Sequence, residues 1–233
     1  MSTLQPPRPL NYVQVAWQSA LAAGLCLGLP AGLLLWLILA NRVGNLTVVK
    51  PLIDFLNTHG LYSIYIVVIS SIMWSYLLGH ISGYRPWWRI GVASALGILA
   101  AWFSPLANVD GILYEYQPNL PIHLNYAASM VGLIGAVTLF VGLAYGLLLR
   151  SIKAALTIGL TTSFVSVLAM LLTIFVFDRM GIRVGTGNLA MVRVTAVDLI
   201  TSALAGGALL GVEFSRFVRV ETSQSSFQMQ GNT

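Results

Sequence analysis

The sequence predicts an all-α protein that crosses a membrane several times. Of its 233 residues, 57% are hydrophobic and only 8% are charged, against about 25% charged residues in an average soluble domain. Its mean hydropathy is +0.83. The apolar stretches are continuous, whereas the strands of a membrane β-barrel would alternate apolar and polar residues. A soluble fold of this size would need more charged residues on its surface, so we expect a polytopic integral membrane protein.

Six apolar stretches are candidate transmembrane helices, joined by short loops. They cover residues 13–41, 61–78, 91–106, 123–149, 154–177 and 187–219. No polar segment is long enough to fold separately, so we predict a single transmembrane domain over residues 13–219. The proline-rich residues 1–12 are expected to be an exposed arm, and the Ser- and Gln-rich residues 220–233 a disordered tail.

The first stretch and the loop after it have features of their own. As a straight helix the first stretch would extend about 40 Å, so it must tilt, protrude or kink, and Pro30 offers the kink. In the following loop, Pro51 suits the first position of a helix and Gly60 the position after its end. We therefore predict a short helix over residues 51–60 that lies in the membrane interface.

Small residues recur every fourth position in the first and last stretches, which places them on one face of each helix. Such small-residue ridges allow another helix to approach closely in a membrane, so we predict that both are helix-packing faces. The ridge in the first stretch consists of Gly24, Gly28 and Gly32, and the ridge in the last consists of Ala203, Gly207 and Gly211.

The turn between the second and third stretches is rich in aromatic and basic residues, which are typical of the membrane–water interface. We predict an interfacial anchor formed by Tyr84, Arg85, Trp87, Trp88 and Arg89. An even number of spans places both termini on one side. Slightly more Lys and Arg residues fall on that side than on the other, which predicts that both termini are cytoplasmic.

The last stretch carries a carboxylate, Asp198, inside an apolar run. A carboxylate held away from water needs a partner, a proton or a hydrated path. Ser202 lies four residues later on the same helical face, whereas Arg193, five residues earlier, does not. Two interpretations remain open. Asp198 is either an ion, proton or partner-subunit site, or it forms a structural ion pair with Arg193 or Arg183.

No pattern of catalytic or metal-binding residues accompanies Asp198. The sequence has no Walker A loop, no G-x-S-x-G elbow, no H-E-x-x-H motif and no paired carboxylates within a predicted span. Of the three histidines, only His59 and His123 fall on the same predicted side, both near helix ends, so we expect no metal, haem or other cofactor. Glu213 is expected to pair with Arg216 at the other end of the last stretch.

These observations favour a non-catalytic function. The favoured hypothesis is a membrane subunit or assembly partner of a larger complex, because the loops are short, the ridges suit partner helices and no internal site is evident. The alternative is a small-solute or ion transporter or permease component with Asp198 in the path. The expected partners are the lipid bilayer and other membrane subunits or a second copy. Nucleic acid is not expected, because the Lys and Arg residues are spread over loops.

Overall fold

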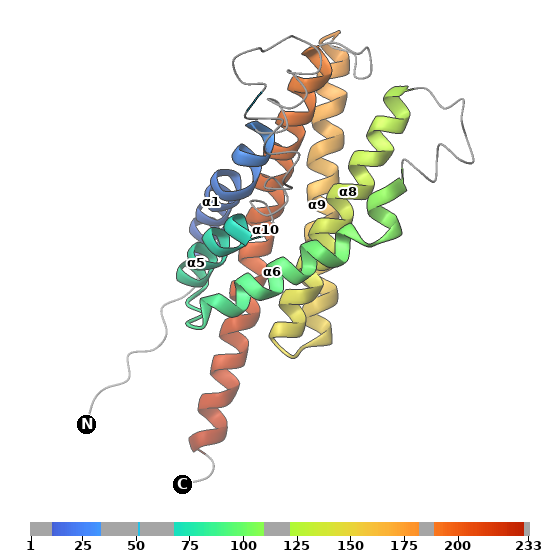
Figure 1. The fold of residues 1–233 in the computed structure, drawn as a ribbon. Helices are drawn as coiled ribbons and strands as arrows, with labels where there is room; N and C mark the ends of the chain where they lie inside the picture. Colours follow the sequence, from blue (N-terminus) through green and yellow to red (C-terminus); the bar gives the residue numbers. More distant parts are fainter. Residues whose placement is uncertain (1–10, 34–50, 52–67, 110–121, 182–188, 231–233) are drawn as a thin grey trace.

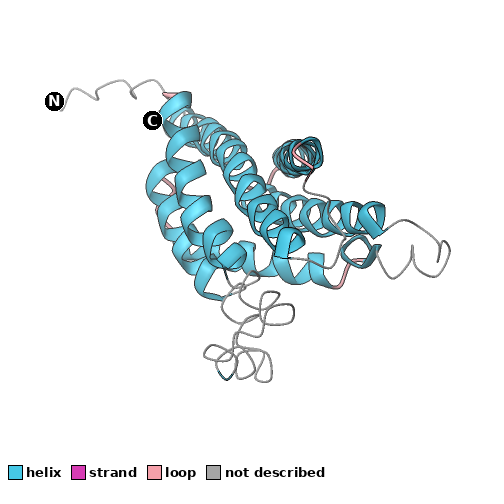
Figure 2. Cartoon of the chain, turned by 90° about the horizontal axis from the view of Figure 1, so that it is seen from above, coloured by secondary structure: helices cyan, strands magenta, loops and turns pink. Residues whose placement is uncertain are grey.

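A computed structural model of the chain describes residues 11–33, 51, 68–109, 122–181 and 189–230, and the part that it describes is helical throughout apart from turns (Figures 1 and 2). The elements are α1 (Tyr12–Ala23), the π-helical η1 (Gly24–Gly28), α5 (Ser70–Ser82), α6 (Trp87–Trp102), the 3-10 helix η3 (Pro105–Asn108), α8 (Ile122–Leu148), α9 (Ile152–Arg179) and α10 (Leu189–Gln230).

Six of these helices are arranged as a closed ring. α8 packs against α9, α9 against α10, α10 against α1, α1 against α5, α5 against α6, and α6 returns to α8. Figure 1 shows α10 running the length of the bundle beside α1 and α9. The ring therefore joins the first and last described helices, and it encloses a space that all six helices border.

The prediction of an all-helical fold is confirmed for the described residues, and four of their helices, rather than the six predicted, are long and apolar enough to cross a membrane. They are Tyr12–Leu33, Ala127–Leu148, Ile152–Arg179 and Ala196–Val220. α6 is apolar but has 16 residues, about 24 Å of helix, and the described part of α5 has 13. The interfacial helix predicted over residues 51–60 lies outside the described residues except at Pro51.

The backbone of the first helix widens just before Pro30. Residues Gly24–Gly28 form a π-helical segment, in which the Leu29 amide donates to the Gly24 carbonyl five residues earlier. Pro30 has no amide proton, and its ring would crowd the carbonyl of Cys26 in a regular α-helix. A π-helical segment relieves this crowding. The irregularity expected at Pro30 thus appears one turn earlier.

The polar tail differs from its prediction. Residues after Val220 were expected to be disordered, but α10 continues as helix to Gln230. Starting a helix is the costly step, and adding residues to an existing one is not, so a long apolar helix can carry a polar extension. With 42 residues α10 is about 63 Å long, more than the ~40–45 Å of a whole bilayer.

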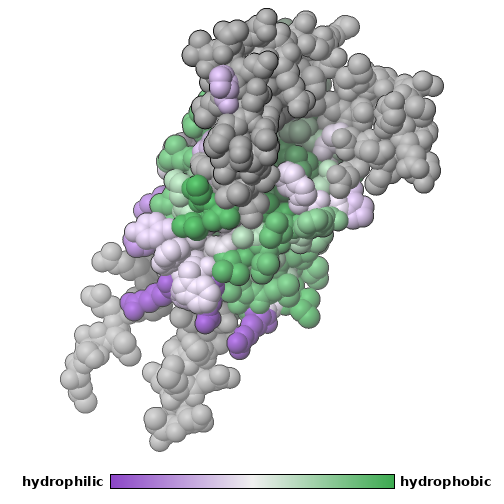
Figure 3. Space-filling model, viewed as in Figure 1, coloured by the Kyte–Doolittle hydropathy of each residue, from purple (hydrophilic) through white to green (hydrophobic). Residues whose placement is uncertain are grey.

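Apolar side chains dominate both the outside and the core of the bundle. Figure 3 shows a green apolar area over the visible face with purple hydrophilic residues below it. The main core lies toward the α5–α6 turn, where Leu78, Ile90, Tyr145, Ile158 and Phe214 are completely buried. This core closes one end of the helix ring.

Candidate functional site: a cavity inside the helix ring

The two small-residue ridges lie against each other. A Cβ atom added at Gly28 would lie 2.9 Å from the Ala203 Cβ, and one at Gly32 would lie 3.0 Å from the Ala196 carbonyl oxygen. The other ridge positions are equally tight: Gly24 faces Leu204, Gly207 faces Ala23 and Gly211 faces the Ser19 side chain. The ridges therefore form the α1–α10 contact of the ring, and they are occupied within the chain itself.

Asp198 is fully buried near the start of the candidate span Ala196–Val220. The next turn of α10 carries Thr201 and Ser202 on the same side. Thr201 lies 3.0 Å from the hydroxyl of Thr173 on α9, and Ser202 faces the interior of the ring. The side chain of Arg193 lies outside the described part, so the predicted Asp198–Arg193 pairing stays a prediction. At the other end, Arg216 lies 3.7 Å from Glu213, as the spacing predicted.

The aromatic and basic turn between α5 and α6 is built around Gly83, whose φ of 76° favours glycine. Trp87 and Trp88 are exposed, and the Arg89 guanidinium lies over the Trp88 ring at 5.4 Å. Tyr84 differs from its neighbours. Its ring is partly buried and packs edge-on against Phe214 of α10 at 5.7 Å. Of the predicted anchor residues, Tyr84 thus packs against the core, while the tryptophans and arginines face outward.

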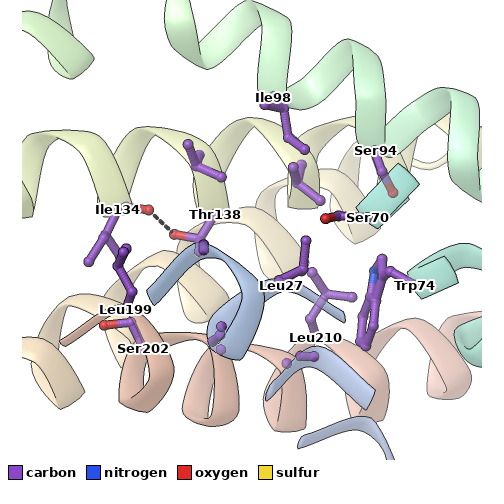
Figure 4. Close-up of a pocket in the computed structure, with 18 of the residues that line it drawn as sticks. Leu27, Ser70, Trp74, Ser94, Ile98, Ile134, Thr138, Leu199, Ser202 and Leu210 are labelled. Carbon is purple, nitrogen blue, oxygen red and sulfur yellow. Dashed lines mark hydrogen bonds between the residues drawn. The ribbon is translucent and has the colours of Figure 1, made fainter. Parts of the chain in front are cut away.

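A cavity of about 380 Å³ lies inside the ring. Figure 4 shows Ser70, Trp74 and Ser94 toward one side of the view, Leu199 and Ser202 toward the other, and Leu27 between them. The volume lies in the range of small-ligand sites in proteins, about 300–1,000 Å³. The lining is mostly apolar, carries hydroxyl groups and includes no ionisable side chain among the described residues: Ala23, Leu27, Gly28, Ala31, Ser70, Ser71, Trp74, Ser94, Ile98, Trp102, Met130, Leu133, Ile134, Val137, Thr138, Val141, Thr162, Leu199, Ser202, Ala203, Gly206, Gly207 and Leu210.

The cavity ends where the main core begins. On α8 its wall stops at Val141 and the next turn buries Tyr145; on α10 it stops at Leu210 and the next turn buries Phe214. The rings of Tyr145 and Phe214 pack at a centroid distance of 5.3 Å. At the opposite end the lining includes Trp102, whose side chain is 51% exposed. The cavity is therefore closed toward the α5–α6 turn and reaches the surface near Trp102.

A chain of hydrogen bonds fixes the closed end. The Trp74 indole N–H donates to the Tyr145 hydroxyl at 2.7 Å, and the Tyr145 and Ser94 hydroxyl oxygens lie 2.6 Å apart. The Ser94 hydroxyl donates its single proton to the Ile90 carbonyl at 2.8 Å, so Tyr145 must donate to Ser94. These hydrogen bonds link α5, α8 and α6, and each donor among them has an acceptor.

The described part of the chain holds no group of three or more His, Cys, Asp or Glu residues that could bind a metal ion. No family model matches the chain, and no curated protein or solved structure is similar to it. The comparisons therefore assign no function to the chain.

Sequence reasoning missed the cavity and its hydroxyl groups. It treated Asp198 as the polar centre, yet Asp198 is not among the described residues that line the cavity, whereas its neighbour Ser202 is. A signal was present in the sequence. Several small polar residues lie in apolar stretches and face the cavity, namely Ser70, Ser71, Ser94 and Thr162. Only the order of the helices around the ring shows that they share one space.

Proposed function

We propose that this protein is a non-catalytic integral membrane protein that binds a small, uncharged, lipid-soluble molecule in the cavity between its six helices. The observation that carries this proposal is a cavity of about 380 Å³ whose wall includes buried hydroxyl groups without hydrogen-bond partners in the described structure, among them Thr162 and Ser202. Such a wall is suited to a ligand that is apolar over most of its surface and polar at a few points.

The cavity reaches the surface near Trp102, so a molecule dissolved in the bilayer can enter it from outside the ring. A protein that only held other subunits together would gain from filling the space with larger side chains, so its presence supports a binding function.

The absence of ionisable groups from the described lining argues for an uncharged ligand. A charged solute would lose its hydration in an apolar cavity and would find no opposite charge in exchange. This weakens the alternative of an ion path through Asp198, since Asp198 is not a lining residue. We favour binding over transport because an uncharged, lipid-soluble molecule crosses a bilayer without a protein's help.

Membership of a larger complex is compatible with this proposal, but the glycine ridges do not support it. The hypothesis of an assembly partner relied on the glycine ridges being available to partner helices. Gly28 and Gly207, representative of the two ridges, each approach the opposite helix of the same chain. Other subunits or a second copy would therefore have to dock elsewhere, for instance on the apolar outer face of α9, where Leu160 and Phe164 are exposed.

We further propose that all six helices of the ring cross the bilayer and that both termini are cytoplasmic. Basic residues gather at the end of the ring that carries the α5–α6 and α8–α9 turns, namely Arg85, Arg89, Arg150, Lys153, Arg216 and Arg219. Excess Lys and Arg in short loops marks the cytoplasmic side. The same end is the one from which α10 extends beyond the ring (Figure 1).

Two single substitutions test this orientation. The one native cysteine, Cys26, is buried, so a membrane-impermeant maleimide should report mainly on introduced thiols. Lys153→Cys, at the start of α9, should be labelled in inside-out vesicles and protected in intact cells. Met180→Cys, at the other end of α9 and 67% exposed, should show the opposite pattern. The reverse assignment of the two positions would refute the orientation.

Photolabelling in lipid nanodiscs tests the binding proposal. The probes are a diazirine-bearing dodecane, dodecan-1-ol and dodecanoate, and peptide mass spectrometry locates the adducts. Both neutral probes should label cavity residues in a saturable way, and ionised dodecanoate should not. Val137→Phe narrows the cavity and should abolish this labelling. Leu160→Phe makes a comparable change on the 58% exposed outer face of α9 and should leave it intact.

Two results would overturn the proposal. One is labelling of the outer helix faces alone, without saturation, which would mean that the probes report only lipid contact. The other is saturable cavity labelling by a diazirine phospholipid that neither neutral probe displaces, which would make the cavity a site for membrane lipid. A loss of labelling in the Leu160→Phe control would show instead that the bundle does not tolerate substitution.

A further inference from the structure

The hydroxyl groups around the cavity fall into two kinds. In a membrane helix, a Ser or Thr hydroxyl commonly donates to a carbonyl three or four residues earlier. Thr138 does so toward the Ile134 carbonyl at 2.7 Å, and Ser94 toward the Ile90 carbonyl at 2.8 Å. The protons of these two lining hydroxyls are therefore already used within the protein.

Three buried hydroxyls at the α9–α10 wall are of the other kind. Thr162, Ser166 and Ser202 are 1%, 0% and 4% exposed, and their oxygens have no hydrogen-bond partner in the described structure. Thr162 and Ser202 line the cavity directly. Thr162 and Ser166 are four residues apart, and so are Ser202 and Gly206, so each pair shares a helix face.

Gly206 joins these residues into one strip. A Cβ added at Gly206, itself a lining residue, would collide with the Ser166 hydroxyl and lie 3.7 Å from the Thr162 methyl carbon. The lack of a side chain at Gly206 thus lets the Ser166 hydroxyl and the Thr162 methyl group lie close to α10, one turn from Ser202. We call Thr162, Ser166 and Ser202 the hydroxyl strip.

We propose that the hydroxyl strip recognises the ligand, and that the ligand carries one uncharged hydrogen-bonding group, an alcohol or a carbonyl, on an otherwise apolar body. This inference rests on the proposed function. Buried hydroxyls without partners are unfavourable in an apolar environment, and a ligand that reaches them recovers the lost hydrogen bonds. Hydroxyls both donate and accept, so the strip suits either group, and it offers no charge to an acid or amine.

The apolar body would lie against the remainder of the wall. Leu27 of η1, Ile134 of α8 and Leu199 and Leu210 of α10 surround the space in Figure 4. The Trp74 and Ser94 groups on the opposite side are engaged in the chain to Tyr145, so they shape the cavity without being free to bind. The ligand is thereby oriented with its polar group toward α9 and α10.

Ser71 provides an internal control. Its hydroxyl is also buried and without a partner in the described structure, and it lines the cavity, but it belongs to α5 rather than to the α9–α10 wall. If any cavity hydroxyl could recognise the ligand, Ser71→Ala would weaken binding as much as a change in the strip. If the strip is the recognition element, Ser71→Ala leaves the selectivity unchanged.

The experiment compares unlabelled dodecan-1-ol and dodecane as competitors of the diazirine-bearing dodecane, in nanodiscs of the full chain. In the wild type, dodecan-1-ol should displace the probe at a roughly tenfold lower concentration than dodecane does. Thr162→Val and Ser202→Ala, whose side chains line the cavity, should each reduce this preference by roughly twofold to tenfold, the factor expected for one neutral hydrogen bond. Ser71→Ala should keep it. Displacement by dodecane, which needs no hydrogen bond, shows that a variant still has its cavity.

The outcomes separate this inference from the proposed function. If neither competitor displaces the probe from the wild-type cavity, the proposed function itself fails. If both displace it equally well, the cavity binds apolar molecules but the hydroxyl strip does not recognise a polar group, and the inference is wrong. An alcohol preference that persists in both the Thr162→Val and the Ser202→Ala variant also overturns it, and shows that ordered water or the closed end of the cavity supplies the contact.

Discussion

Tyr145 at the closed end of the cavity offers a test of the buried hydrogen bonds inside the bundle. Proton donation runs from Trp74 to Tyr145, from Tyr145 to Ser94 and from Ser94 to the Ile90 carbonyl. Tyr145→Phe keeps the buried ring and removes the hydroxyl, which leaves the Trp74 N–H without an acceptor. Ser94→Ala leaves the Tyr145 O–H without an acceptor. The double variant leaves only the Trp74 donor unsatisfied, as Tyr145→Phe alone does.

The expected magnitudes follow from the bonds that each change breaks. Interhelical hydrogen bonds in membrane proteins contribute about 0.6 kcal/mol on average and up to about 1.7 kcal/mol. Ser94→Ala breaks one such bond, so it should cost about 0.6–1.7 kcal/mol of unfolding free energy. Tyr145→Phe breaks two and should cost about 1–3 kcal/mol. The double variant should cost about the same as Tyr145→Phe, so the two single effects should fail to add by about the Ser94 value.

The assay is equilibrium unfolding in mixed micelles with increasing SDS, followed by tryptophan fluorescence. Ser75→Ala is the matched control, because the Ser75 hydroxyl donates only within its own helix, to the Ile72 carbonyl at 2.8 Å, and its loss should cost less than about 0.5 kcal/mol. Additive effects of Tyr145→Phe and Ser94→Ala would refute the hydrogen bond between Tyr145 and Ser94, since they would mean that the two hydroxyls act independently.

Three further predictions concern the ring itself. At Gly28 an ideal Cβ would lie only 2.9 Å from the Ala203 Cβ, so Gly28→Val adds atoms where there is no room for them. This overpacking should lower the free energy of unfolding in the SDS titration by about 1–3 kcal/mol. An unchanged unfolding midpoint would show that the first helix and α10 separate freely. Thr201→Val removes the 3.0 Å contact with Thr173 and should cost about 0.6 kcal/mol in the same titration; a stabilised variant would contradict it. Cys26, 1% exposed, should react with a bilayer-permeant maleimide only after SDS unfolding, and rapid labelling of the native protein would contradict its burial.

Much of the fold could be read from hydropathy, because membrane helices must satisfy their backbone hydrogen bonds internally and therefore appear as long apolar runs. Four of the six predicted stretches became helices of spanning length. The lengths of the helices and their order around the ring were harder to predict. α6 begins earlier than predicted, at Trp87, because the tryptophans of the turn extend the helix, and it ends before Pro105, where η3 starts. Composition predicted disorder after Val220, whereas α10 continues as helix to Gln230, because composition ignores the continuity of a helix already formed.

The site was less predictable than the fold. Spacing alone identified the small-residue faces, because a four-residue repeat is visible in one helix. It could not identify which faces meet, and so did not show that Gly28 and Ala203 pack against each other. A cavity is a property of several helices at once, and the residues of its wall are ordinary members of apolar stretches. Asp198 drew attention because a charge in an apolar run is conspicuous, while Thr162 and Ser202 are not.

The contact between α1 and α10 sets the order of events during synthesis. These helices are the first and last in the ring, so the wall cannot be completed until α10 has left the ribosome and entered the bilayer. Until then the glycine face of Gly24 and Gly28 lacks its partner helix. Contacts so distant in sequence form late and leave partly built intermediates vulnerable. We therefore expect a nascent chain that stops before α10 to be bound by membrane-embedded chaperones or degraded by membrane-embedded proteases. The proposed ligand should bind only after α10 has joined the ring.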